Sequence, residues 1–233
     1  MPNIGILLAL IAVSAIPAVA AFLWFRLARF PVSPRVFLVS LFAGATSVFA
    51  ALFLQNFVTE TGMLPPLTDR TSLLLEIFVR IAFTEELARL FLLVPLFFAF
   101  RRFNQMPASP GGVSADAMAK ASGLVAGLGF GILESATYGA AYPINVLFRA
   151  LITTPLHAAC GSRVGASIAT FRERPALAVF QFLSAVAIHG IFNLLVVTPA
   201  RFAPWVAIFV AFSALASSIQ MISRGMRAED DAQ

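Results

Sequence analysis

Charged residues are scarce in this sequence of 233 residues. Asp, Glu, Lys and Arg make up 12% of the chain, whereas hydrophobic residues make up 60%. Soluble domains carry about 25% charged residues, so the composition excludes an ordinary soluble domain. No segment between the apolar runs is long or polar enough to form one either. We therefore predict a single integral membrane domain over residues 1–233, embedded in a lipid bilayer.

Cysteine is almost absent, and the first apolar run lacks a basic segment in front of it. Cys160 is the only cysteine, which excludes an intramolecular disulfide framework. No Lys or Arg precedes Arg26, although a secretory signal peptide needs a basic segment before its apolar stretch. We therefore expect the run over residues 4–25 to be a retained transmembrane helix.

Apolar runs long enough to cross a bilayer recur along the whole chain. Each has on the order of 20 residues, the length that a transmembrane helix needs. Proline and glycine separate the runs, for example at Pro107–Gly112 and at Pro143. We predict an all-α, polytopic bundle of about seven transmembrane helices, over residues 4–25, 36–57, 71–100, 117–141, 145–171, 176–198 and 204–222.

The net charge of +5 comes from basic residues in the short connections, which indicates membrane topology and not a nucleic-acid partner. Alternate connections differ strongly, with ten basic residues on one side against three on the other. The positive-inside rule then predicts an extracytoplasmic N-terminus and a cytoplasmic C-terminus. The ten are Arg26, Arg29, Arg35, Arg101, Arg102, Lys120, Arg172, Arg174, Arg224 and Arg227, and the three are Arg70, Arg149 and Arg201.

Ionisable side chains nevertheless occur inside the apolar runs. A charge at the centre of a membrane helix costs roughly 2.5–3.5 kcal/mol, so such groups usually mark a pathway or an active site. Four predicted helices bring polar groups to a similar depth, and spacing by four residues places Glu85 with Arg89, and His189 with Asn193, on shared helix faces. We predict a polar catalytic layer inside the bundle, formed by Glu85, Glu86, Arg89, Glu134, His157, His189 and Asn193.

Each feature also has a purely structural interpretation. Glu86 with Arg89 could be a buried ion pair, and His157 could form only an interhelical hydrogen bond. Cys160 is expected to be an inert buried thiol, and Arg163 is expected to extend to the cytoplasmic interface. Glycines four residues apart, at Gly123, Gly127 and Gly131, indicate close packing of helix backbones.

Four short motifs together resemble the glutamic-type intramembrane proteases related to PrsW, within the superfamily of CAAX proteases and bacteriocin-processing enzymes. The motifs are EELAR at 85–89, FGILE at 130–134, His157 and HGIFN at 189–193, and the resemblance covers residues 71–198. It implies a peptidase of a prokaryotic plasma membrane that hydrolyses a peptide bond of a membrane-associated protein or peptide.

The resemblance also implies that Glu85 or Glu86 activates the attacking water. The chemistry of the neighbouring residues is compatible with that reaction, since Arg89 would orient the pair of carboxylates. His189 and Asn193 would stabilise the oxyanion through hydrogen bonds. The site would be completed by Glu134 and His157.

Two histidines and three carboxylates also meet the ligand requirement of zinc, but the sequence lacks the helical HExxH motif. We favour a metal-free mechanism with no cofactor, and zinc held by His157, His189, Glu86 and Glu134 is the competing mechanism. A proton-coupled transporter or channel and a non-catalytic membrane scaffold are the alternative functions. The sequence specifies neither the substrate nor the oligomeric state.

Overall fold

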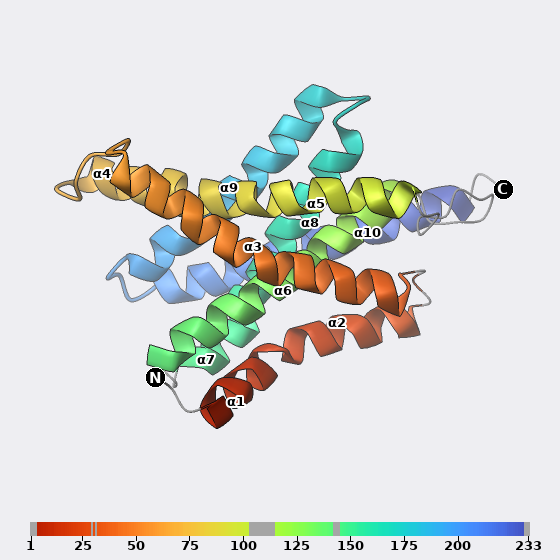
Figure 1. Ribbon diagram of the computed structural model, residues 1–233, viewed down its shortest axis with the longest axis horizontal. Helices are drawn as coiled ribbons and strands as arrows, with labels where there is room; N and C mark the ends of the chain where they lie inside the picture. Colours follow the sequence, from red (N-terminus) through yellow and green to blue (C-terminus); the bar gives the residue numbers. More distant parts are fainter. Residues whose placement is uncertain (1–3, 29, 31, 103–114, 142–144, 231–233) are drawn as a thin grey trace.

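The computed structural model describes residues 4–28, 30, 32–102, 115–141 and 145–230, and all regular structure within these ranges is helical (Figure 1). The all-α prediction is thereby confirmed. The predicted breaks at Pro107–Gly112 and at Pro143 lie outside the described residues.

Seven helical rods follow one another along the described residues, and each corresponds to one predicted span within about three residues at either end, except that α10 continues eight residues past the predicted end at 222. Three of the rods consist of more than one element, and two of these contain a π-helical stretch. The rods are α1 (Ile4–Ser14) with α2 (Ile16–Leu27); α3 (Pro34–Glu60); α4 (Arg70–Leu75), η1 (Glu76–Phe83) and α5 (Thr84–Arg102); α6 (Ala115–Ala141); α7 (Asn145–Phe148), η2 (Arg149–Thr153) and α8 (Thr154–Thr170); α9 (Pro175–Val197); and α10 (Ala203–Asp230).

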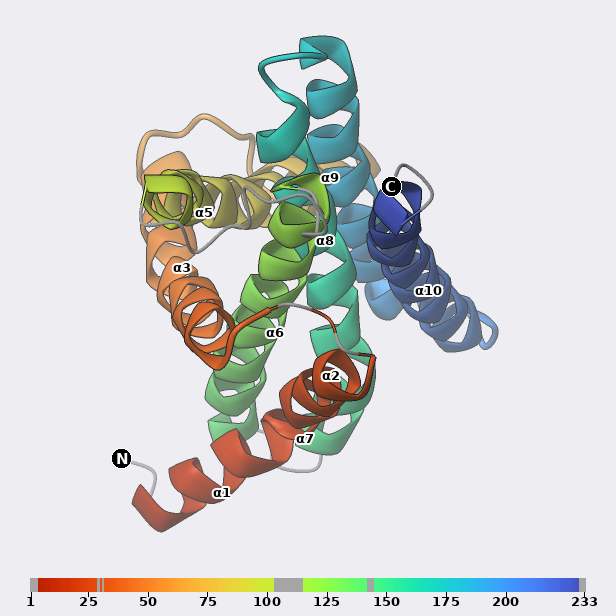
Figure 2. The same cartoon turned by 90° about the vertical axis from the view of Figure 1, so that its right-hand side faces the viewer.

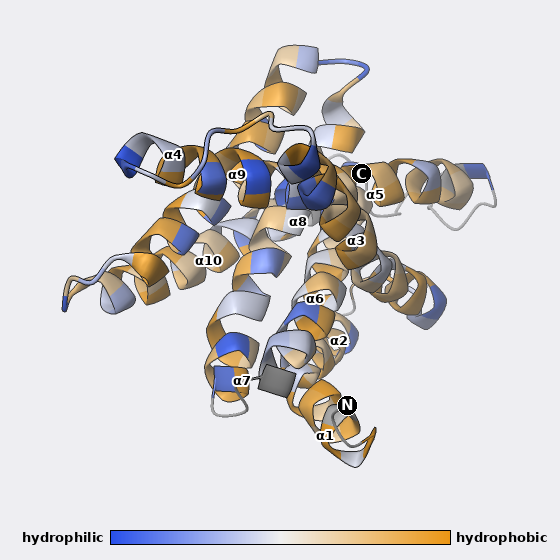
Figure 3. Ribbon diagram, turned by 60° about the vertical axis from the view of Figure 1, so that its left-hand side comes forward, coloured by the Kyte–Doolittle hydropathy of each residue, from blue (hydrophilic) through white to orange (hydrophobic). Residues whose placement is uncertain are grey.

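Five helical segments in the described ranges are long and apolar enough to cross a membrane, which confirms a polytopic membrane protein. Large apolar side chains such as Phe53 and Phe209 are exposed. The ribbon coloured by hydropathy shows that hydrophobic residues predominate along most helices (Figure 3). The two remaining predicted spans, 71–100 and 145–171, are the rods that contain the π-helical stretches. The five segments are Ile4–Leu27, Pro34–Glu60, Asp116–Gly139, Pro175–Val197 and Ala203–Arg224.

Local sequence signals explain where several helices begin. Ser33 caps α3, because its Oγ accepts a hydrogen bond from the Val36 amide at 3.2 Å. Asp69 caps α4 in the same way and accepts from the Ser72 amide at 2.7 Å. Hydrogen bonds from Ser72 lower the pKa of Asp69 below its usual value. Pro175 begins α9, where its missing amide hydrogen costs nothing.

Helices α6 and α8 lie side by side at the centre of the bundle, with α3 and α5 on one flank and α9 and α10 on the other (Figure 2). Glycine makes this contact close. A Cβ atom on Gly127 would lie 2.0 Å from the His157 carbonyl oxygen, and one on Gly161 would lie 2.2 Å from the Gly123 carbonyl oxygen. Any larger residue would push the backbones apart, so these glycines fix the distance between α6 and α8.

Arg163 is buried, and α10 supplies hydrogen-bond acceptors next to it. The guanidinium donates to Ser218 Oγ at 2.7 Å and to Ser217 Oγ at 3.2 Å. It also donates to the backbone carbonyls of Ala159 and Ala214. Arg163 therefore joins α8 to α10.

Candidate active site

The residues that the sequence singles out converge on one place inside the bundle. They come from α5, α6, α8 and α9, which surround the centre of the structure. Five of them are buried, with at most 6% of the residue surface exposed: Glu85, Glu86, Arg89, His157 and His189. Glu134 and Asn193 are partly buried. The predicted polar layer is therefore one connected site.

Glu86 has both carboxylate oxygens engaged. Arg89, one turn further along α5, forms an ion pair with Oε2, and Nδ1 of His189 lies 2.9 Å from Oε1. The Arg89 guanidinium also lies over the ring of Phe130, with 4.7 Å between its central carbon and the ring centroid. These contacts fix the His189 ring and hold Glu86 as a paired, buried carboxylate.

Glu85 is held less tightly than its neighbour. Its Oε1 accepts a hydrogen bond from Gln55 Nε2 at 3.2 Å. Its Oε2 is buried and accepts no hydrogen bond among the described residues, and the nearest ion-pair partner is His189 Nε2 at 3.6 Å. A buried, unsatisfied carboxylate oxygen is costly, so it indicates a position where a water, a metal or a substrate group binds.

The carboxylate of Glu134 is contacted by two nitrogen-bearing side chains. His157 Nε2 and Arg149 Nη2 each lie 2.8 Å from its Oε2. His157 Nδ1 faces Arg89 Nη2 at 3.4 Å, and since a guanidinium only donates, this arrangement makes Nδ1 the acceptor and Nε2 the donor to Glu134. The guanidinium of Arg149 also stacks over the ring of Tyr138 at 4.2 Å.

Three of these side chains form a group that could hold a metal ion. Glu85, His157 and His189 each offer a ligand atom within 4.8 Å of the other two. Imidazole nitrogen and carboxylate oxygen are ligands that zinc prefers, and three protein ligands with one open position are typical of a catalytic zinc site. Glu86, on the other nitrogen of His189, matches the outer carboxylate that commonly orients a metal-binding histidine. The residues therefore fit a divalent metal.

A cavity of about 520 Å³ gives access to this group. Glu85, Glu134, His157 and Asn193 line it, and so do the exposed apolar side chains at the end of α9. Asn193 thus faces the same space as the carboxylates, one helical turn beyond His189. The cavity is large enough for a water molecule together with a stretch of polypeptide.

The sequence did not assign several of the side chains around the cavity to the site. Gln55 binds Glu85, and Arg149 binds Glu134 and stacks on Tyr138. A polar or charged residue inside an apolar run was the available signal for Gln55 and Arg149. Arg80 also lines the cavity and is paired with Glu76, four residues before it.

The two π-helical stretches are a further feature without a signal in the sequence. η1 ends at Phe83, two residues before Glu85. η2 ends at Thr153, four residues before His157 in the first turn of α8. π-helical turns are rare and frequently occur at functional sites. They rotate the residues that follow relative to an unbroken α-helix, and so they contribute to the directions of the Glu85 and His157 side chains.

Comparison with known proteins agrees with this geometry. The sequence model of the PrsW family of intramembrane metalloproteases matches residues 32–218, a range that contains every residue of the site. No curated protein and no solved structure matches the chain. The match extends over most of the sequence, and the chain therefore belongs to the PrsW family of intramembrane metalloproteases.

Proposed function

We propose that the protein is an endopeptidase that hydrolyses a peptide bond of a membrane-associated protein, in or beside the bilayer. The main observation in support is the unsatisfied Oε2 of Glu85, which lies where two buried histidines meet a cavity of about 520 Å³. Membership of a protease family supports the reaction class. The proton-transport alternative is less favoured, because the ionisable groups surround one cavity and do not form a row across the bilayer.

Glu85, His157 and His189 would hold a zinc ion, and His157 would exchange one of its present ring-nitrogen contacts, to Glu134 or to Arg89, for the metal. The sequence favoured a metal-free mechanism and assigned Glu86 and Glu134, not Glu85, to the competing zinc site. Glu86 is paired with Arg89 and His189, and Glu134 is held by His157 and Arg149. Glu85 is therefore the carboxylate in this group that has an oxygen without a hydrogen-bond partner among the described residues. When bound, zinc activates a water molecule and polarises the scissile carbonyl.

The remaining side chains would position the reacting groups. Glu86 accepts from His189 and holds its ring in place. Glu134 lines the cavity, and its carboxylate would accept the proton of the attacking water. Asn193 would donate a hydrogen bond from its side-chain amide to the oxyanion that forms on the carbonyl. Arg149, which contacts Glu134 Oε2, would keep that carboxylate in position.

Metal analysis of the purified protein tests this ligand set. We expect about one zinc per chain, and we expect chelation to abolish cleavage of a membrane peptide until zinc is restored. His189→Gln should lose the metal, whereas Cys160→Ser should retain it, because this buried thiol lies outside the ligand group. Full activity in protein stripped of metal would contradict the proposal and favour the metal-free glutamic mechanism.

The cavity opens at the end of the bundle where few basic residues lie, next to the C-terminal ends of α6 and α9. The predicted topology makes this the extracytoplasmic side, so we propose that water and substrate enter from there. A membrane-impermeant maleimide should label Val196→Cys in intact cells, and should label Glu173→Cys only after permeabilisation. The opposite pattern would reverse the orientation.

A further inference from the structure

A second large cavity lies at the opposite end of α5 from the candidate active site. It is a groove of about 540 Å³ between α5, α8 and α9. The ends of α8 and α9 that carry part of its lining extend beyond α5 in both views (Figures 1 and 2). It is lined mostly by apolar side chains, among them Leu90, Val94, Phe98, Ala178, Val179 and Phe182.

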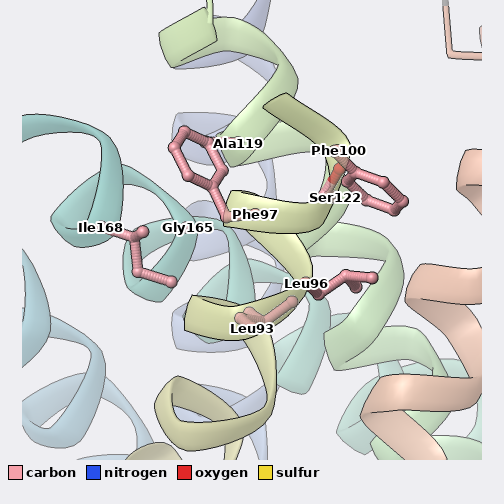
Figure 4. Close-up of a pocket in the computed structure, with 8 residues that line it drawn as sticks. All are labelled: Leu93, Leu96, Phe97, Phe100, Ala119, Ser122, Gly165 and Ile168. Atoms are coloured by element: carbon pink, nitrogen blue, oxygen red, sulfur yellow. The ribbon is translucent and has the colours of Figure 1, made fainter. Parts of the chain in front are cut away.

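The apolar character continues from the groove toward the centre of the bundle. Phe97 and Ile168 line both the groove and a small neighbouring cavity between α5, α6 and α8 (Figure 4). That cavity is lined by apolar side chains and Gly165, with the hydroxyl of Ser122 as the polar exception. The groove is therefore suited to a hydrocarbon chain and not to a hydrated molecule.

A positive charge lies at one end of this apolar groove. Arg172, in the connection between α8 and α9, lines the groove, and its guanidinium lies 5.6 Å from the ring centroid of Phe98. Arg102 lies one turn beyond Phe98 on the same face of α5. Glu173 is the neighbouring acid, and its side chain is exposed.

We propose that the groove binds one anionic phospholipid, with an acyl chain between α5 and α9 and the phosphate at Arg172. A basic pocket between transmembrane helices is the typical site for an anionic lipid headgroup. The volume lies within the range of small-molecule sites, roughly 300–1,000 Å³. It is too small to enclose a transmembrane helix, which is about 10–12 Å wide with its side chains. The bound lipid would hold α5 and α9 at a fixed separation.

Binding measurements on the purified full chain test the proposal. Phosphatidylglycerol and phosphatidylcholine with identical acyl chains are titrated in detergent, with native mass spectrometry and the thermal unfolding midpoint as readouts. We expect wild type to prefer phosphatidylglycerol and Arg172→Gln to bind it about fivefold more weakly, which corresponds to about 1 kcal/mol for one basic residue. Arg201→Gln, at the opposite end, is the matched control and should behave like wild type.

Three further measurements distinguish a bound lipid from other occupants of the groove. Val94→Trp should fill the groove and weaken both lipids, whereas glycerol phosphate without acyl chains should leave the unfolding midpoint unchanged. A photoreactive residue at Val179 should crosslink to a lipid. The proposal is overturned if Arg172→Gln retains the preference, if glycerol phosphate binds as tightly as the lipid, or if the crosslink joins a protein chain instead.

Discussion

Replacing Glu85 by Gln should reduce the cleavage of a membrane peptide at least about 100-fold, because a general base or a metal ligand at this position contributes roughly 10²–10⁴ to the rate. Glutamine keeps the size of the side chain and can still hydrogen-bond to Gln55. It removes the negative charge of the unsatisfied Oε2, however, which lies among the two histidines. The measurement is the single-turnover rate of protein reconstituted in lipid.

Two controls make this result specific. Glu173→Gln removes an exposed carboxylate at the far end of the bundle and should leave the rate unchanged. Metal content then distinguishes the roles of Glu85, because loss of zinc in Glu85→Gln indicates a ligand and retention indicates a base. A folded Glu85→Gln protein with the wild-type cleavage rate would remove Glu85 from the mechanism.

Arg89→Met should lower the free energy of unfolding by about 3–5 kcal/mol, the usual cost of leaving one partner of a buried ion pair alone. Arg89 and Glu86 are both fully buried, so no solvent can replace the lost charge. The guanidinium also stacks on Phe130, so the stacking contribution is lost as well. Equilibrium unfolding in mixed micelles measures the effect.

The double variant Arg89→Met with Glu86→Gln should recover part of the loss, since it no longer buries an unpaired carboxylate. Lys120→Met is the control for an ordinary ion pair, because it breaks the partly exposed contact with Asp116 at the same kind of helical spacing. That change should cost less than about 1 kcal/mol. Equal losses for Arg89→Met and Lys120→Met would contradict a buried, energetically coupled pair.

Much of the architecture was predictable from composition and helical spacing. Long apolar runs divided by proline indicated the helical rods, and the cost of burying charge indicated that Glu85, Arg89 and His189 would converge. Partners that depend on contacts between distant segments were not predictable. Gln55 is 30 residues from Glu85, and only the packing of α3 on α5 brings them together.

The division of roles between the two adjacent glutamates also required three dimensions. Neighbouring residues in a helix point about 100° apart, so Glu85 and Glu86 have different surroundings. The sequence left this choice open and assigned Glu86 to the competing zinc site. In the structure Glu86 faces Arg89, while Glu85 lines the cavity beside His157. The π-helical turns of η1 affect this rotation, and spacing alone does not reveal them.

The glycine contacts between α6 and α8 constrain how the protein could admit a polypeptide. Gly127 and Gly161 bring two backbones into direct contact, so at these positions no side chain separates α6 from α8. Glu134 on α6 and His157 on α8 therefore lie on two helices that cannot move closer to each other at these glycines. Any widening that lets a substrate strand reach them must therefore come from the helices that flank this central pair.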